Sequence, residues 1–490
     1  TPVYTNGGTT CLGNPVTFTI TVNPTPSVDV EPNQVACKDA PTTTVTFSGD
    51  VPGTVFNWTN SNTSIGLGAS GTGSIPSFSA KNTGTAPVVA TITVTPQYSN
   101  GGKTCTGTPI TFTFTVNPAP TVNSVTNKVV CADDNVSAIN FTGTVTGTTF
   151  SWTNSNASIG LAATGTGNIA AFTALNTGNS PEIATITVTP QFTNAGVTCN
   201  GTPTLFTITV NPDPTVNAVA NQAVCNGIQS IGIVFTGAVT GTVYSWTNSN
   251  PSIGLGATGT GNIPAFTATN NGINATTGTI VVTPRFTNAG VTCTGPTTTF
   301  TITVLPTPTV NPVSNQTVCT GHLTTAINFT GNVPGTSYIW TNNTPSIGLA
   351  ASGTGNIPAF TAINNSSAPL VALIVVTPRF MGCDGAPMAI AITVDPLPSQ
   401  LVCNDMSTFV LDADCISTVL PGDILLNAQG CFQNFTVTVT GITGVPNYGN
   451  TVTAANLGQT LKVTVKNLIT NSSCSGLIKV IDATLPQVTC

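Results

Sequence analysis

Cysteines recur at two fixed positions in four tandem copies of one pattern, and their thiols have the clearest chemistry in this chain. The spacing between the two cysteines of a copy is identical in three copies and slightly shorter in the fourth. Regular cysteine pairs, with the single histidine His322 in only one copy, indicate structural disulfides and an oxidising, extracellular compartment. The early cysteines are Cys37, Cys131, Cys225 and Cys319, and the late ones are Cys105, Cys199, Cys293 and Cys383.

The reach of an extended chain favours one pairing of these cysteines. Cys105 and the next early cysteine, Cys131, flank a proline-rich joint, and extended chain at ~3.3 Å per residue separates them by tens of ångströms. A disulfide needs its Cα atoms within roughly 7 Å, so we expect each bond to close within a copy, although a sharp fold-back at the joint would permit the other pairing. The expected bonds are Cys37–Cys105, Cys131–Cys199, Cys225–Cys293 and Cys319–Cys383.

A zinc site, a nucleophilic active site and a calcium site each agree less well with these residues than structural disulfides do. Structural zinc needs close pairs such as C-x-x-C, and even the closest cysteines in the sequence, Cys403 and Cys415, are much farther apart than that. A catalytic triad or Cys–His pair cannot recur with one histidine, so we expect no enzyme. Residues 213–306 hold one carboxylate, Asp213, where calcium needs several, and 213–396 contains no lysine for an isopeptide bond. A weaker calcium candidate in the last unit consists of Asp405, Asp412, Asp414 and Asp423.

A glycine motif raises the question of a cofactor. The stretch SIGLGASGTG at 64–73 has the spacing G-x-G-x-x-G of a dinucleotide-binding loop, and a copy of it occurs in each of the four repeats. Two copies replace the second glycine by Ala162 and Ala350, and no helix-forming run follows the loop. The motif therefore predicts a glycine-rich turn, and we expect no cofactor.

The repeat itself defines the elements that position these residues. Its period of 94 suits an independent β-sandwich of about 100 residues better than a solenoid unit. Alternating apolar and polar residues, as in ATITVTP, predict half-buried strands, so the expected fold class is all-β, a tandem array of β-sandwich domains in an elongated rod. The expected domains are a C-terminal part of a repeat at 1–24, repeats at 25–118, 119–212, 213–306 and 307–396, and a divergent four-cysteine sandwich at 397–490.

One tryptophan per repeat has two interpretations. It could stack on a sugar, or it could fill the centre of the sandwich. An aromatic residue two positions earlier shares its face of the strand, which favours the core. The tryptophans are Trp58, Trp152, Trp246 and Trp340, and the aromatic neighbours are Phe56, Phe150, Tyr244 and Tyr338.

The two ends of the chain depart from the repeat. Residues 1–24 match the end of the next unit, so we expect a slice of a longer chain in which Cys11 bonds to a missing unit, and PQVTC at 486–490 predicts that Cys490 opens another. Joints such as NPTP and NPDP predict semi-rigid spacers between the domains. Five sandwiches joined in this way would form a rod with a length on the order of 200 Å. Three connectivities are open for the last unit's own disulfide candidates, Cys403, Cys415, Cys431 and Cys474.

The composition excludes one class of partner. Only 5% of residues are charged, with 9 basic and 15 acidic side chains and a net charge of −6. So few cations cannot neutralise a row of phosphates, and nucleic acid is a poor partner. The sequence has no uninterrupted apolar run long enough to cross a bilayer, so we expect no membrane span in this segment.

The pattern NQTVC…INFTG…YIWTN…SIGLAASGTGNIPAFTA, traced through 25–396, resembles the PKD-like, immunoglobulin-like repeats of very large Bacteroidota cell-surface proteins. The pattern CND…LDADC…GQTLKVTV in the last unit resembles a second repeat of such proteins. The resemblance implies type IX secretion and a relation to gliding-motility adhesins. It favours a structural stalk or filament of a cell-surface adhesin. Alternatives are a multivalent array that binds glycans or other surface proteins, and a filament that assembles laterally with copies of itself.

Overall fold

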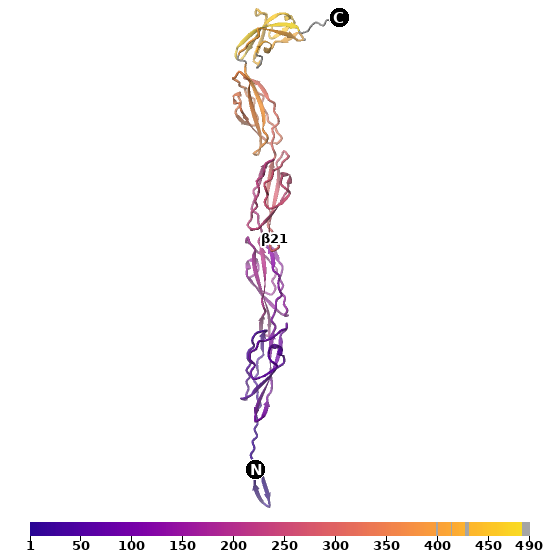
Figure 1. The fold of residues 1–490 in the computed structure, drawn as a ribbon, viewed down its shortest axis with the longest axis vertical. Coiled ribbons are helices and arrows are strands. Elements are labelled where there is room, and N and C mark those ends of the chain that lie inside the picture. The colour runs from indigo at the N-terminus through magenta and orange to yellow at the C-terminus, as the bar shows by residue number, and fades with distance from the viewer. Residues whose placement is uncertain (398–399, 413, 427–430, 483–490) are drawn as a thin grey trace, which may run out of the picture. The chain divides into compact units, whose positions relative to one another are not determined.

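The computed structural model describes residues 1–397, 400–412, 414–426 and 431–482, and in this part of the chain every regular element is a strand or a short 3-10 turn (Figure 1). The all-β class is therefore confirmed. Cys490 lies outside the described residues. No helix among the described residues is long and apolar enough to span a bilayer.

The repeat at 119–212 shows the design. Its main sheet has the order β12-β11-β14-β16-β9, and β15 pairs with the end of β14. All neighbours are antiparallel except β9, which runs parallel to the last strand, β16. The strands are β9 (Lys128–Cys131), β11 (Thr149–Asn154), β12 (Thr164–Thr166), β14 (Glu182–Asn194), β15 (Val197–Asn200) and β16 (Thr204–Asn211).

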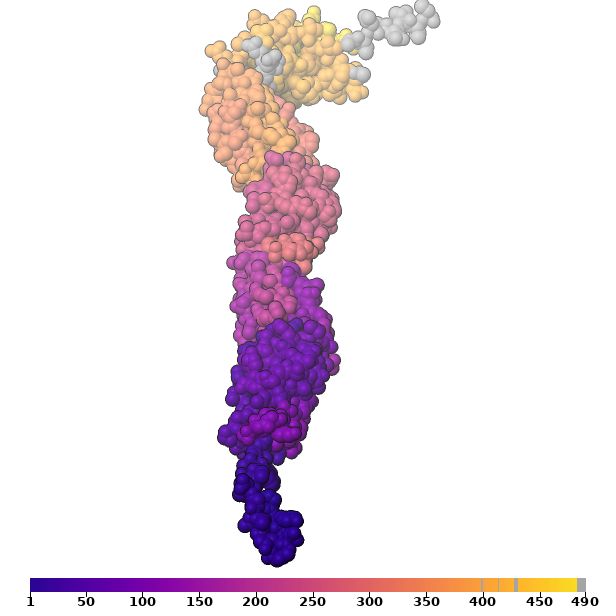
Figure 2. Space-filling view, turned by 60° about the horizontal axis from the view of Figure 1, so that its bottom comes forward, coloured from indigo at the N-terminus to yellow at the C-terminus, as the bar shows by residue number. Residues whose placement is uncertain are grey.

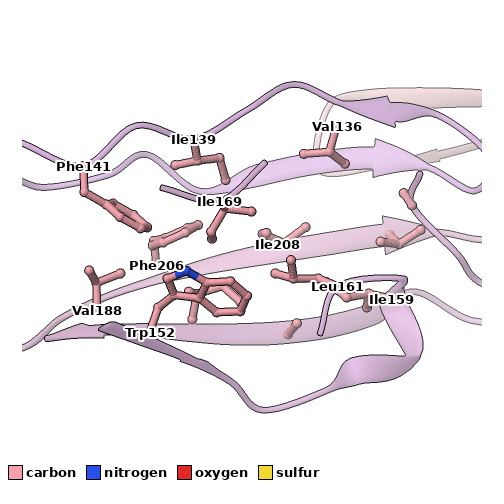
Figure 3. Close-up of a cluster of buried hydrophobic side chains, with 14 of the residues drawn as sticks. Val136, Ile139, Phe141, Trp152, Ile159, Leu161, Ile169, Val188, Phe206 and Ile208 are labelled. Atoms are coloured by element: carbon pink, nitrogen blue, oxygen red, sulfur yellow. The ribbon is translucent and has the colours of Figure 1, made fainter. Parts of the chain in front are cut away.

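A second, thinner layer covers this sheet. It consists of the pair β10 (Asn135–Val136) and β13 (Phe172–Thr173) and of a bridge between Ile139 and Ile169. Apolar side chains of β11, β14 and β16 face this layer, and Figure 3 shows Trp152 and Phe206 opposite Ile139 and Ile169. Strand alternation thus buries every second residue and leaves threonines outside.

The other three repeats use the same strand order. Their sheets are β5-β4-β6-β8-β3 with β7, β19-β18-β20-β22-β17 with β21, and β25-β24-β26-β28-β23 with β27. In the repeat at 25–118 the strands are β3 (Gln34–Cys37), β4 (Val55–Asn60), β5 (Ser70–Thr72), β6 (Val88–Asn100), β7 (Lys103–Thr106) and β8 (Ile110–Asn117). The repeat at 213–306 has β17 (Gln222–Cys225), β18 (Val243–Asn248), β19 (Thr258–Thr260), β20 (Thr276–Asn288), β21 (Val291–Thr294) and β22 (Thr298–Leu305). The repeat at 307–396 has β23 (Gln316–Cys319), β24 (Ser337–Asn342), β25 (Ser352–Thr354), β26 (Leu370–Phe380), β27 (Cys383–Asp384) and β28 (Met388–Asp395).

A short 3-10 turn follows the tryptophan strand in each repeat. In the first repeat Asn62 caps the turn by accepting a hydrogen bond from the backbone N–H of Ser64, and Gly66 ends it with a φ of 95°. Only a residue without Cβ adopts that left-handed backbone easily. The turns are η1 (Thr63–Ile65), η2 (Ala157–Ile159), η3 (Pro251–Ile253) and η4 (Pro345–Ile347).

The last unit has a smaller sheet of order β29-β34-β33-β31, in which β29 runs parallel to β34. A separate pair of strands, β30 and β32, accompanies it. The elements are β29 (Met406–Leu411), β30 (Ile416–Thr418), η5 (Pro421–Asp423), β31 (Phe435–Thr440), β32 (Thr451–Thr453), η6 (Ala454–Asn456), β33 (Thr460–Asn467) and β34 (Ser473–Asp482).

The first residues form a hairpin of β1 (Val3–Asn6) and β2 (Thr9–Leu12), and residues 13–24 then run on without a strand partner among the described residues. This segment, in the darkest indigo, is narrower than the repeat that follows it (Figure 2). Its sequence matches the end of a repeat, but only the hairpin is formed as strands, because no strand is assigned to residues 13–24.

Candidate functional site

Disulfides join each repeat to the next one. The early cysteine of one repeat bonds to the late cysteine of the following repeat, with Cα–Cα distances of 5.5, 5.5 and 5.6 Å. The prediction of bonds within a repeat, Cys37–Cys105, Cys131–Cys199, Cys225–Cys293 and Cys319–Cys383, is therefore wrong, and so is the alternative of Cys105 with Cys131. The observed bonds are Cys37–Cys199, Cys131–Cys293 and Cys225–Cys383.

The two cysteines of one repeat cannot meet because they lie at opposite ends of its sheet. Cys37 ends β3 and lies opposite Asn117, the last residue of β8. Cys105 lies in the β6–β7 hairpin opposite Tyr98. Val88 of β6 pairs with Val116, near the end of the sheet that holds Cys37. Tyr98 lies ten residues farther along β6, which is a distance of about 33 Å at ~3.3 Å per residue.

A pair of asparagines accompanies two of these disulfides. Asn117, fully buried at the end of β8, accepts a hydrogen bond of 2.8 Å from Asn194 of the next repeat and donates one of 3.4 Å to the carbonyl of Asn194. Asn211 and Asn288 repeat this arrangement with the same two distances. Both features lie at the joint, so each of these boundaries is held by one covalent bond and one reciprocal amide pair. These asparagines were not among the predicted site residues, although both pairs have the same separation of 77 residues in the sequence.

Charge also gathers at the second of these joints. Burial raises the pKa of the Asp213 carboxyl above its usual range, and the negative charges of Asp133 and Asp134 raise it further. Asp133 and Asp134 follow Cys131, and Asp213 lies in the joint itself. Ionisation of Asp213 is therefore opposed by the same arrangement that brings the two repeats together.

The last unit is attached in the same way and also closes a bond of its own. Cys319 bonds to Cys431 with a Cα–Cα distance of 5.4 Å, and Cys403 bonds to Cys474 at 5.6 Å. Of the candidates named in this unit, Cys415 carries a free thiol. The other free thiols among the described residues are Cys11 and Cys105, so the expectation that Cys105 is bonded fails within this chain.

The four tryptophans are buried, with exposed fractions of 5–7%, and therefore present no ring surface for a sugar. The glycine motif serves them. A Cβ on Gly165 would overlap the ring of Trp152, and the same overlap would occur at the equivalent glycines, Gly71, Gly259 and Gly353. The second glycine of the motif, Gly68, has only one backbone oxygen at 3.9 Å, which explains why alanine replaces it in two repeats. The motif is a packing device beneath the tryptophan.

Side chains of the types that bind metals occur across the part of the chain that the structure describes. Among the described residues no three His, Cys, Asp or Glu side chains gather as ligands for a metal. The ion pairs Lys81–Asp39 and Arg379–Asp384 lie at the surface within single repeats and contribute little stability. The feature that recurs at the boundaries is the disulfide.

One repeat of the chain matches a known domain family. Residues 128–214 match the PKD-like domain family. The other three repeats share the strand order of this matched repeat, so the chain contains four tandem β-sandwich repeats, one of which matches the PKD-like family. No curated protein sequence matches the chain. The multiple disulfides of these repeats are typical of extracellular proteins.

Three solved structures show a partial likeness to the chain. Sidekick-1 immunoglobulin domains 1–5 match at 12% identity with a TM-score of 0.27, covering 93% of this chain and 98% of that one. The protocadherin γB4 extracellular domain matches at 13% identity with a TM-score of 0.28, covering 94% and 84%. Drosophila OTK extracellular domains 3–5 match at 11% identity with a TM-score of 0.26, covering 56% and 96%.

Proposed function

We propose that this chain is a structural stalk section of a secreted cell-surface adhesin, which holds a distant binding region away from the cell. The supporting observation is that one disulfide crosses each of the four boundaries between consecutive units from 25 onward. A bond within a repeat would stabilise that repeat alone. A bond across a boundary resists separation of neighbouring repeats along the chain.

The resemblance to repeats of large Bacteroidota surface proteins supports the rest of the proposal. It favours attachment at a bacterial cell surface, export by the type IX system and a relation to gliding-motility adhesins. The low charge and the disulfides suit a protein that persists outside the cell.

The pattern of bonds limits how far the chain can be stretched. The shortest covalent path from Cys37 to Cys431 runs through the bonds Cys37–Cys199 and Cys225–Cys383. Its only polypeptide stretches are the short ones from Cys199 to Cys225 and from Cys383 to Cys431. At ~3.5 Å per residue these stretches reach about 260 Å, against about 1,400 Å for the full polypeptide between the same two ends. The disulfides therefore restrict extension even when every repeat is unfolded.

Single-molecule force spectroscopy tests this role. We expect the oxidised chain, when pulled by its ends, not to show the increases in length that come from extending whole unfolded repeats. After reduction, the same chain should lengthen by about 1,100 Å more. The double variant Cys37→Ser/Cys199→Ser should release part of this hidden length without a reductant. If the oxidised and reduced chains lengthen equally, the disulfides do not carry tension and the stalk proposal loses its support.

A further inference from the structure

The outer face of the main sheet carries an apolar patch in the fourth repeat and is polar in the first. Strand alternation places every second residue of β24, β26 and β28 on this face, away from the core. The positions of the first repeat that are equivalent to the patch hold asparagine or threonine, except at Val89. The apolar patch consists of Ile339, Val371, Leu373, Val375, Ala389 and Ala391.

The patch residues are neighbours on three adjacent strands. The two alanines of β28 lie directly opposite Leu373 and Val375 of β26. Ile339 of β24 lies diagonally from Val375, because its partner on β26 is Thr377. Adjacent strands are about 4.8 Å apart, so these side chains form one continuous surface. This surface is open to solvent, with exposed fractions of 53% for Val371 and 42% for Leu373, and a continuous exposed apolar patch is typical of an interaction site.

The second repeat shows that single exposed apolar residues do not make such a patch. Its apolar residues on the same face, Ile183 and Leu205, are exposed by 58% and 62%. Each of them lies opposite a threonine, Thr209 and Thr187 respectively, so hydroxyl groups separate the two. They provide a matched comparison within the same chain.

The patch has a ridge beside a furrow. The large side chains Val371, Leu373 and Val375 follow one another along β26, whereas Ala389 and Ala391 on the adjacent β28 end at Cβ. In a two-fold interface one patch must be complementary to itself, because the same residues of both copies meet. A two-fold axis that runs along the strands, midway between β26 and β28, brings the ridge of each copy over the furrow of the other. The shape of the patch therefore suits a second copy of itself.

The chemistry of the patch favours the same partner. It has no aromatic ring on which a sugar can stack and no charge that attracts an ionic ligand. Arg379, farther along β26 on this face, is already paired with Asp384. A second copy brings an identical uncharged surface, so the contact buries no unpaired charge.

We propose that this patch is a self-association surface, through which the fourth repeats of two copies of the chain pack face to face. The two sheets would lie about 10 Å apart, as stacked sheets do. Rotation about an axis along the strands preserves strand direction, so the paired strands of the two copies run the same way. The inference concerns contact between copies and holds whether or not the disulfides carry tension.

The size of the patch determines the strength expected of this contact. Three strands and about six residues along each give a surface on the order of 300 Å². Each partner of a stable complex buries about 800 Å². The pairing of free chains should therefore be weak, with a dissociation constant between about 1 μM and about 1 mM.

Sedimentation equilibrium of the full chain, with its free thiols alkylated, measures this association. The unmodified chain should self-associate as its concentration approaches about 1 mM. The test variant is Leu373→Thr/Val375→Thr/Ala389→Thr/Ala391→Thr, which installs the threonines that the first repeat has at the equivalent positions. It should weaken the association by at least roughly tenfold, which corresponds to about 1.4 kcal/mol.

Ile183→Thr/Leu205→Thr is the control, since it removes exposed apolar side chains that do not form a patch. It should associate as the unmodified chain does. The proposal is overturned if the unmodified chain stays monomeric at about 1 mM, if the fourth-repeat variant associates as strongly as the unmodified chain, or if both variants lose association equally.

Filling the furrow separates the two-fold contact from general apolar adhesion. Ala389→Leu/Ala391→Leu enlarges the apolar surface but leaves no room for the ridge of a second copy, so association should weaken. The second repeat has Leu205 at the position of Ala389, so the outer face accepts leucine there. An unchanged Tm would show that the variant is folded. Stronger association of this variant would refute the packing of ridge into furrow.

Discussion

The repeats and the last unit share a sheet design but place cysteine at opposite ends of the same strand. In both, a short strand runs parallel to the last strand, β3 beside β8 and β29 beside β34. Cys37 is the final residue of β3 and lies opposite Asn117. Cys403 precedes β29 by three residues, and Met406 pairs with Leu477, so the same register brings Cys403 to its partner Cys474.

The difference shows how a few residues decide whether a bond closes inside a unit or reaches the next one. A cysteine before the parallel strand lies near the start of the last strand of its own unit. A cysteine at the end of that strand lies at the joint, where the hairpin of the following repeat supplies the partner. The same sheet can therefore stabilise one unit or connect two.

Removing one bond of each kind gives the largest expected effect. Cys37→Ser/Cys199→Ser should lower the free energy of unfolding shared by the first two repeats by about 5 kcal/mol, because it opens a loop of 162 residues. Cys403→Ser/Cys474→Ser opens a loop of 71 residues and should lower the free energy of unfolding of the last unit alone by about 4 kcal/mol. Differential scanning calorimetry should show two transitions changed in the first variant and one in the second.

Cys415→Ser is the matched control, since this thiol is free and exposed. Its transitions should coincide with those of the unmodified protein. If the first double variant changes the transition of only one repeat, the bond does not couple the two, and the contrast with the last unit is lost.

The cores of the two regions also differ, because all four tryptophans lie in the repeats and none in the last unit. Gly165→Ala places a Cβ against the Trp152 ring and should destabilise its repeat by about 1–3 kcal/mol through overpacking. Gly68→Ala changes the neighbouring motif position, where two repeats already have alanine, and should have little effect. Denaturant titration followed by tryptophan fluorescence measures both, and equal losses would contradict the packing role of the motif.

The fold was largely predictable from the sequence because its signals are local. Alternation of apolar residues gave the strands, and the shared face of Phe150 and Trp152 predicted a buried tryptophan. The glycine motif could be separated from a cofactor loop because Ala162 breaks its spacing. The packing of Gly165 of this motif against the Trp152 ring depends on a neighbouring strand, so it could be seen only in the structure.

The disulfide pairing could not be obtained in the same way because it depends on strand direction. Sequence spacing shows that Cys37 and Cys105 belong to one repeat, but not that β3 runs parallel to β8 and carries Cys37 away from the hairpin. The reach of an extended chain limits pairing only between cysteines that are near each other in the sequence. The observed separation of 162 residues lay outside that comparison.

A smaller effect is expected at the amide pair. Asn211→Ala leaves the amide of Asn288 without its partner in a buried joint and should cost about 1–3 kcal/mol. Asn23 forms the equivalent pair with Asn100, and both of its hydrogen bonds are exposed to solvent, so the cost of Asn23→Ala should be smaller. Thermal denaturation of the two variants gives the comparison. Equal costs would mean that burial at the bonded joint adds nothing to the amide pair.

The smallest effect concerns pH at the joint of the second and third repeats. Burial, with Asp133 and Asp134, raises the pKa of Asp213 in the folded chain. A raised pKa in the folded state means that the protonated form is favoured by folding, so this contribution to stability is complete below the unfolded pKa and is lost as pH rises through the folded pKa. Asp213→Asn, which cannot ionise, should retain that stability at neutral pH and show a smaller loss of Tm between pH 4 and pH 7 than the unmodified protein. Asp50→Asn, a change of the same charge in the first repeat, is the control, and it should leave the pH dependence of this joint as it is. Identical pH profiles for Asp213→Asn and the unmodified chain would show that the three carboxylates do not oppose one another across the bonded joint.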